Sequence, residues 1–405
     1  MLIAFKYKNF KSFKNENILD MEATSLKEHE YNIVKIKNVN LLTMAAIYGA
    51  NASGKSNVLQ AFEYMKKMIL INDDSMGYYQ IKEENIYSFM MNNEPISLEV
   101  EILSKDGKIY KYGFESLNYK IKSEWMYEKR INKFYTIFER KENSVLMKVN
   151  NKNNRYDNLD DKTLFLSIYS KIDKKNSDFN NVYKWFINTD YLDLENIKIE
   201  NFIDNTISVK ILSDQNYKSE LQNFILALDL GIEKIKTIPA SMDDLPKSNG
   251  IVKVELLHSI ENNKIKSLPL ELESNGTRKM IYLFDYLIDA LKKGKTLFID
   301  DLDTKLHPLL TRYIINLFHN KEINISNAQL IYTTHDVTNL NKETFRRDEI
   351  WFTEKDDDGV SEIYSLSDYK VDNVKIRNDA TFNKDYLTGR YGAIPELKQF
   401  KMNDI

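Results

Sequence analysis

The fold of this chain is decided by the stretch Gly49-Ala50-Asn51-Ala52-Ser53-Gly54-Lys55-Ser56-Asn57, which has the form G-x-x-x-x-G-K-S. An apolar run, Leu41 to Tyr48, precedes it and a helical pattern follows it, as a phosphate-binding loop requires. The glycines let backbone N–H groups point inward at a phosphate, and the helix start adds partial positive charge. Lys55 would neutralise the β- and γ-phosphates, and the Ser56 hydroxyl would bind Mg²⁺. The alternative is a glycine-containing turn that binds nothing, but the flanks favour a nucleoside triphosphate site.

Composition bounds the class of protein. The 405 residues suffice for two or three domains, and 42% hydrophobic with 29% charged residues is ordinary for a globular protein. The net charge of −3 gives no overall attraction to nucleic acid, and the absence of cysteine excludes disulfides and thiolate metal sites. No segment has the ~18 apolar residues that span a bilayer, and the N-terminus is charged too early for a signal peptide. We expect a cytoplasmic protein without membrane contact.

The order of hydrophobic patterns predicts an α/β fold. Strands are expected in 1–50 and hairpins in 95–140, and the polar stretch 150–161 is expected to be a surface loop. Helices are expected at 55–71, 162–188, 216–232, 276–292 and 307–319, and further strands at 251–259, 265–272, 296–299 and 329–333. Buried strands that alternate with helices indicate a mainly parallel sheet covered on both faces. No heptad pattern is sustained, so no long coiled coil is expected.

Carboxylates and an imidazole follow two of these strands. The apolar strand Thr296 to Ile299 leads into Asp300 and Asp301, and such strand ends are where ligands bind in an open parallel sheet. Asp300 is placed to hold Mg²⁺, and Asp301 to orient or deprotonate the attacking water. His335 follows the strand 329–333 and could hydrogen-bond a γ-phosphate or its water. A polar turn and a structural histidine are the alternatives, and the phosphate loop upstream favours the functional interpretation.

Three further features have two interpretations each. Ser274 opens a helix and could form a second anion site or a simple N-cap. The lysines at 6, 8, 11 and 14 could follow a phosphate backbone, although a solvated strand face is favoured. The acidic run 356–358 could bind a metal, although the tip of a hairpin between 350–353 and 361–364 is favoured.

Together these segments resemble the heads of ABC-type ATPases of the RecF/SMC-like group. The resemblance rests on Asn51 and Ser53, Ser274 with Gly276, Asp300-Asp301, Asp303, Thr334-His335-Asp336 and an opening segment Asn9 to Phe13. Three further segments are similar to the RloA-type ATPases of abortive infection and phage defence: Glu273 to Lys279, Arg346 to Lys355, and Tyr386 to Pro395. The resemblance runs from residue 1 to about 397. We find no mechanism for Tyr386 to Pro395 beyond two turns.

The resemblance implies an ATPase head: a mixed sheet with helices on both faces, an antiparallel β-subdomain and a helical insertion. Residues 1–140 would form the N-terminal lobe, 141–250 the mainly helical insertion and 251–405 the C-terminal lobe. ATP with Mg²⁺ would lie between two subunits, bound by Gly49, Asn51, Ser53, Gly54, Lys55, Ser56 and Asn57 of one and by Ser274 and Gly276 of the other. Asp303 would communicate between the two sites, and Asp301 and His335 would serve hydrolysis. Asp301 departs from the usual glutamate, so slow hydrolysis is expected, and Gln80 is only a weak candidate for the glutamine that usually contacts Mg²⁺.

The function expected from this resemblance is that of a sensor and scaffold in anti-phage defence. A homodimer or higher oligomer would control a separately encoded effector, expected to be a Toprim-type nuclease. The first alternative is a RecF-like repair or recombination ATPase that binds DNA directly. A second alternative is a subunit that binds ATP without hydrolysing it.

Overall fold

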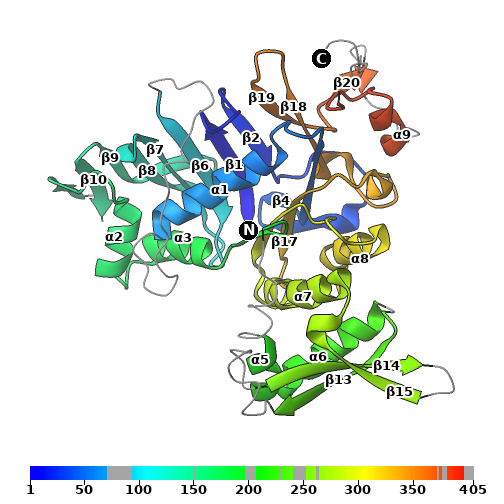
Figure 1. Cartoon of the computed structure of the whole chain (residues 1–405). Coiled ribbons are helices and arrows are strands. Elements are labelled where there is room, and N and C mark those ends of the chain that lie inside the picture. The colour runs from blue at the N-terminus through cyan, green and yellow to red at the C-terminus, as the bar shows by residue number, and fades with distance from the viewer. Residues whose placement is uncertain are drawn as a thin grey trace, which may run out of the picture.

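The computed structural model describes residues 1–70, 94–149, 152–196, 207–228, 230–239, 252–260, 264–371, 374–375 and 381–395. Gln80, the candidate magnesium-contacting glutamine, lies outside these ranges. Figure 1 shows a sheet around β17 and β18, an antiparallel sheet beside it and a smaller sheet below α7. No helix in the described ranges is long and apolar enough to cross a membrane.

The central sheet carries the phosphate loop. Its strand order is β12-β16-β17-β5-β18-β19, and all neighbours run parallel except β18 and β19. The strands are β12 (Asp190–Asp193), β16 (Thr296–Asp300), β17 (Gln329–Thr333), β5 (Met44–Gly49), β18 (Ile350–Lys355) and β19 (Ser361–Ser365). Because parallel strands end at the same edge, the residues that follow β5, β16 and β17 meet there.

Helices cover both faces of this sheet. Phe298 and Ile331 pack with α1 (Lys55–Leu70) in one core, whereas Leu297 and Leu330 pack with α7 (Asn275–Lys293) and α8 (Pro308–His319) in a second core. Successive strand residues point to opposite faces, which explains why neighbours in sequence belong to different cores. The mixed sheet with helices on both faces, predicted from the sequence, is confirmed.

Local signals set the ends of α7. The Ser274 hydroxyl accepts a hydrogen bond from the Thr277 N–H at 3.1 Å, as an N-cap does. Gly294 ends the helix with φ +66°, in the left-handed region that glycine adopts without strain. Between these ends, apolar residues such as Met280, Leu283 and Leu287 face the core.

The antiparallel β-subdomain is an eight-stranded sheet that shares the core of α1. Its order is β11-β10-β9-β8-β7-β6-β1-β2, and α2 (Phe165–Ile172) and α3 (Ser177–Ile187) pack in the same core. The strands are β11 (Lys152–Tyr156), β10 (Ser144–Val149), β9 (Lys133–Lys141), β8 (Lys120–Arg130), β7 (Ile109–Leu117), β6 (Ile96–Leu103), β1 (Leu2–Lys8) and β2 (Asn17–Asp20). The prediction of a surface loop at 150–161 was wrong for 152–156, which pair with β10 as the outermost strand.

A small sheet lies against the other core. It has the order β13-β14-β15, and α6 (Gln215–Ala227) packs against α7, with the Tyr217 and Phe284 rings 5.5 Å apart. The remaining elements are β13 (Ile232–Pro239), β14 (Val252–Ile260), β15 (Lys264–Pro269), α5 (Ser208–Ser213), α9 (Phe382–Leu387), the ribbons β3 (Ile33–Ile36) with β4 (Val39–Leu42) and β20 (Lys370–Val371) with β21 (Val374–Lys375), and the 3-10 helices η1 (Glu30–Asn32), η5 (Leu270–Leu272), η6 (Val337–Asn339) and η7 (Arg347–Glu349).

The division into lobes at 140 and 250 stays a prediction. Within 141–250, α2, α3, α5 and α6 are helical, but β10 and β11 extend the antiparallel sheet and β12 joins the central sheet. The middle of the chain therefore contributes strands to both the antiparallel sheet and the central sheet.

Candidate nucleotide-binding site

The predicted phosphate loop lies between β5 and α1. Gly49 (φ +154°) passes so close to β18 that a Cβ there would lie 2.5 Å from the Thr353 carbonyl oxygen, so glycine is required. The Lys55 ammonium folds back over the loop and donates to the carbonyl oxygens of Gly49 and Ala50, both at 2.9 Å. Burial lowers the pKa of Lys55 to about 8, although the negative charges of Asp301, Asp300 and Asp303 act to raise it. A cation thus lies between the loop and the carboxylates.

Asp300 ends β16 and meets the phosphate loop. Its Oδ1 accepts a 2.6 Å hydrogen bond from the Thr333 hydroxyl on β17, and the Ser56 hydroxyl also donates to its carboxylate. Burial, together with the charge of Asp301, raises the pKa of Asp300 to about 6, although these two hydrogen bonds lower it. The structure therefore brings together the two residues expected to hold Mg²⁺.

A hydroxyl beside a buried carboxylate fits the chemistry of Mg²⁺. The ion prefers hard oxygen ligands and is commonly held by one or two protein groups together with substrate phosphates. Among the described residues no group of three or more His, Asp or Glu side chains could hold a metal ion by itself. Ser56 and Asp300 would hold the ion here, and bound magnesium would neutralise charge on the phosphates.

Asp301 and His335 face one another beside this pair. Asp301 has φ +52°, and its N–H donates to the Thr333 hydroxyl at 2.8 Å, which fixes the turn. Its Oδ1 is buried without a hydrogen-bond partner among the described residues and lies 4.0 Å from His335 Nε2. The backbone N–H of His335 donates to Asp303 Oδ1 at 3.2 Å. Burial lowers the pKa of the His335 imidazole, and the nearby charge of Lys55 lowers it further. An unpartnered carboxylate oxygen next to an imidazole can accept a proton from a water molecule.

The other loop residues fall into two groups. The Ser53 hydroxyl is 2.6 Å from the Thr353 hydroxyl of β18, and the Asn57 amide donates at 2.8 Å to the Ser12 hydroxyl between β1 and β2, so both side chains bind neighbouring parts of the chain rather than facing open space. Asn51 is exposed beside the cavity described next. Thr333 and Thr353 were missed by the sequence reasoning. Thr333 could have been noticed, because it ends the strand that leads to His335.

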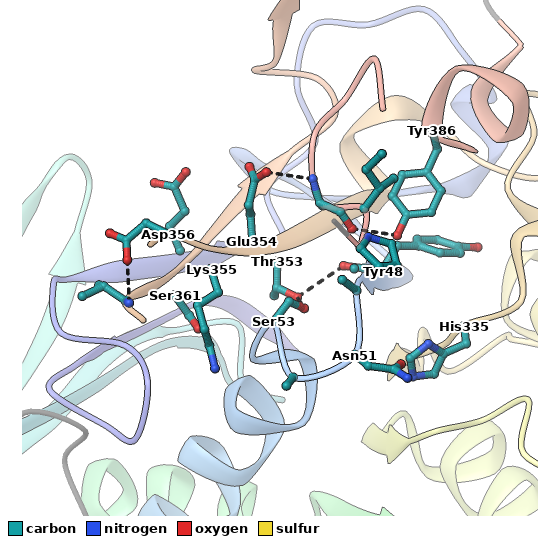
Figure 2. A pocket seen from close by; sticks show the side chains of 18 of the residues that line it. Tyr48, Asn51, Ser53, His335, Thr353, Glu354, Lys355, Asp356, Ser361 and Tyr386 are labelled. Carbon is teal, nitrogen blue, oxygen red and sulfur yellow. Dashed lines mark hydrogen bonds between the residues drawn. The ribbon is translucent and has the colours of Figure 1, made fainter. Parts of the chain in front are cut away.

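A cavity of about 1340 Å³ opens in front of the loop and is shown in Figure 2. It is lined by residues 48–53 of β5 and the loop, by His335, by 353–357 of the β18–β19 hairpin and by parts of 386–395. Glu354 accepts a hydrogen bond from the Ala393 N–H at 3.1 Å, and the Tyr386 hydroxyl donates to the Ala393 carbonyl at 3.0 Å. The C-terminal segment thus borders this cavity, whose lining includes Asn51, Ser53 and His335 but not Lys55, Ser56, Asp300 or Asp301.

The Ser274 segment lies beside the turn that follows β16. Ser274 bonds within its own helix to Thr277, and a Cβ on Gly276 would lie 3.4 Å from the Lys305 carbonyl oxygen. The roles predicted for Ser274, Gly276 and Asp303 concern a second subunit, and they stay predictions.

Two features that the sequence left open have defined surroundings in the structure. The acidic run 356–358 lies at the tip of the hairpin between β18 and β19, with a 2.9 Å hydrogen bond from Asp356 N–H to the Val360 carbonyl. Lys6 and Lys8 form ion pairs with Glu99 and Glu94 at 3.8 and 3.2 Å, so these two charges are compensated, whereas Lys11 donates to the neutral Gln60 amide.

Comparisons with known proteins give the following matches. Residues 44–341 match the family model described as "AAA domain, putative AbiEii toxin, Type IV TA system". No curated protein matches the sequence. Similar solved structures include an Smc head bound to the C-winged helix domain of ScpA (15% identity, 92% of this chain and 99% of that chain, TM-score 0.49). They also include RecF-ATPrS of the RecFOR pathway (13%, 90% and 98%, 0.39) and cbiO1 from Clostridium perfringens, part of the ABC transporter complex cbiONQ (10%, 96% and 92%, 0.30).

Proposed function

The chain belongs to this family of AAA-domain ATPases, and we propose that it binds and hydrolyses ATP as the sensor of a defence system. A dimer would hold Mg·ATP at its interface, and its nucleotide state would control a separately encoded effector, a nuclease of Toprim type. The observation that carries the ATPase part is the convergence of Lys55, Ser56, Asp300, Asp301 and His335 at one sheet edge.

Each group in this convergence has a distinct part in the proposed reaction. Lys55 would exchange its two carbonyl partners for phosphate oxygens when ATP binds, which restores a full set of charge-assisted hydrogen bonds. Asp301 would accept the proton of the attacking water, with His335 positioned against the terminal phosphate. Asp is one methylene shorter than Glu, and a displacement of ~1 Å can reduce a rate ~10²-fold, so slow turnover is expected.

Two findings support the defence part of the proposal. The description of the matched family names the AbiEii toxin and a type IV toxin–antitoxin system. The sequence also resembles ATPases of abortive infection. The paired lysines of β1 offer little support for direct DNA binding by that face. In this proposal the effector is restrained by the ATPase and released when a phage product changes the nucleotide state.

Lys55→Ala tests the ATPase part. The variant is expected to bind ATP about 100-fold more weakly, because the cation over the loop and its charge-assisted hydrogen bonds are removed, while its thermal unfolding stays close to that of the wild type. Calorimetric titration with Mg·ATP measures the affinity. Lys66→Ala is the matched control, since Lys66 is also buried in α1 but bonds the Thr189 carbonyl away from the site. Retained affinity in Lys55→Ala, or equal loss in Lys66→Ala, would contradict the site.

The same variant tests the defence part in cells. Wild-type chain co-expressed with the product of the adjacent reading frame is expected to protect against phage, and the Lys55→Ala form is expected to leave cells unprotected. Plaque counts on the two strains measure this. Equal protection would remove ATP from the mechanism, and protection without the adjacent gene would remove the separate effector.

A further inference from the structure

Lys279 is a buried cation that the proposed reaction does not use. It lies one turn into α7, beyond the N-cap Ser274, and is 2% exposed. Its ammonium donates to the Thr304 carbonyl oxygen in the turn after β16. Burying a lysine is costly unless opposite charge compensates it. Here burial lowers the Lys279 pKa to about 8, and the carboxylates of Asp303 and Asp301 oppose that shift.

The turn that Lys279 contacts is held in an unfavourable backbone conformation. Asp301 and Lys305, at its two ends, have φ +52° and +59°, a region that residues with a Cβ rarely adopt. Such conformations persist only where surrounding contacts hold them, and they cluster at functional sites. From β17, Thr333 holds the start of the turn by accepting hydrogen bonds from the Asp301 and Leu302 N–H groups. From α7, Lys279 holds its other half.

The same turn approaches the first residues of α7. A Cβ at Gly276 would lie 3.4 Å from the Lys305 carbonyl oxygen, an ordinary van der Waals contact, so the first turn of α7 and this turn are close neighbours. The helix α7, which Ser274 caps, and the turn that carries Asp301 are therefore packed together and joined by a buried charge-assisted hydrogen bond from Lys279. Through this bond a shift of the helix start would displace the Lys279 ammonium from the Thr304 carbonyl or carry Thr304 with it.

We propose that Lys279 is a positioning residue that couples the Ser274 end of α7 to the placement of Asp301. This inference rests on the proposed function, in which Ser274 contacts the triphosphate held by a second subunit. Docking of that triphosphate would fix the start of α7, and Lys279 would transmit this constraint to the turn that orients the attacking water. Hydrolysis would then depend on closure of the dimer, although each subunit binds ATP by its own loop.

The test compares two buried lysines in the full-length protein. Lys279→Met is expected to lower kcat about 100-fold, as expected for a catalytic group displaced by ~1 Å, while the Kd for Mg·ATP stays within threefold. Lys66→Met removes a buried lysine that also donates to a backbone carbonyl, that of Thr189, and is expected to leave kcat within twofold. Thermal unfolding of both variants shows how much stability each loses. A kcat for Lys279→Met equal to that of the wild type, or no lower than that of Lys66→Met, overturns the inference.

Two further measurements separate coupling from a structural role. If Lys279 and Ser274 act together, the fold-loss in kcat of the Ser274→Ala/Lys279→Met double variant is smaller than the product of the two single fold-losses. In the Ser274→Ala/Lys66→Met double variant, the fold-loss in kcat should equal that product. Multiplicative loss in both pairs contradicts the inference.

If Lys279→Met does not fold, Lys279→Arg keeps the charge but moves the donors, and it is expected to lower kcat about tenfold at unchanged affinity. An unchanged kcat in the Lys279→Arg variant would also contradict the inference. A wild-type chain that binds no ATP would refute the proposed function itself. That result is distinguishable from the outcomes above, which contradict only the role of Lys279.

Discussion

The Asp300 carboxylate serves the site at a cost to the stability of the nucleotide-free protein. Burial raises its pKa from 3.8 to about 6, so the folded state retains a proton that the unfolded state releases. A group with a raised pKa contributes stability below its unfolded pKa, and this contribution is lost as the pH rises through the folded pKa. Asp300→Asn, which keeps an oxygen acceptor for Thr333 and Ser56, should therefore be more stable than the wild type at pH 7 by up to about 3 kcal/mol. The difference should shrink as the pH falls, to a small remainder near pH 4, and vanish only below the unfolded pKa of 3.8.

Urea unfolding at pH 4 and pH 7, with chelator and without nucleotide, measures this difference. Asp289→Asn is a control of opposite sign. Burial would raise the pKa of Asp289, but hydrogen bonds from Lys293 and Lys295 outweigh it and lower the pKa. Its substitution should reduce stability at pH 7. An Asp300→Asn protein less stable than the wild type at pH 7 would contradict this account.

Single residues differ in how well the sequence predicts their surroundings. Lys55, Ser56 and Asp300 could be placed because each follows a buried strand at a fixed spacing, and neighbouring parallel strands bring their ends together. The bond between Ser53 and Thr353 joins residues 300 positions apart, and the contact of Lys279 with Thr304 depends on how a helix packs on a turn. Such contacts have no local pattern, so the sequence could not predict them.

Helices and strands were predictable where their ends carry local signals. The limits of α7 follow from Ser274 and Gly294, and α8 begins at Pro308 after the N-cap His307. The outermost strand β11 was taken for a loop because its sequence, KNNRY, is polar. An edge strand with both faces near solvent needs no alternation of apolar residues, so the pattern that reveals buried strands is absent there.

The C-terminal turn after α9 is fastened to β18, and Gly392 makes this close approach possible. Its φ is +68°, and a Cβ would lie 2.8 Å from a Glu354 carboxylate oxygen, whereas Gly231 has φ +70° with no atom within 4 Å. Both Gly→Ala substitutions impose a left-handed alanine at about 1 kcal/mol. Gly392→Ala should cost about 2 kcal/mol more, because Glu354 must give up its hydrogen bond with Ala393. Urea unfolding of the two variants measures the difference, and equal destabilisation would show that the contact with Glu354 is unimportant.

The two cores lie on opposite faces of one central sheet, and each carries one part of the proposed site. The phosphate loop leads into α1 in one core, whereas Ser274 caps the start of α7 in the other. The sequence predicted this layered fold because buried strands alternate with amphipathic helices. It could not predict how the small β13–β15 sheet is attached. There the His258 imidazole lies 2.6 Å from the Glu273 carboxylate, directly before Ser274.

This arrangement makes a definite prediction about assembly. Asp301→Ala removes the proposed proton acceptor but leaves the contacts of Lys55, Ser56 and Asp300, so ATP should bind and remain intact. If ATP joins two subunits, the variant should sediment as a stable dimer with Mg·ATP and return to the smaller species when nucleotide is removed. Lys55→Ala, which lacks the cation of the loop, should show no change with ATP. Sedimentation velocity with and without Mg·ATP distinguishes these outcomes. Identical profiles for Asp301→Ala in both conditions would mean that nucleotide binding and association are separate events in this chain.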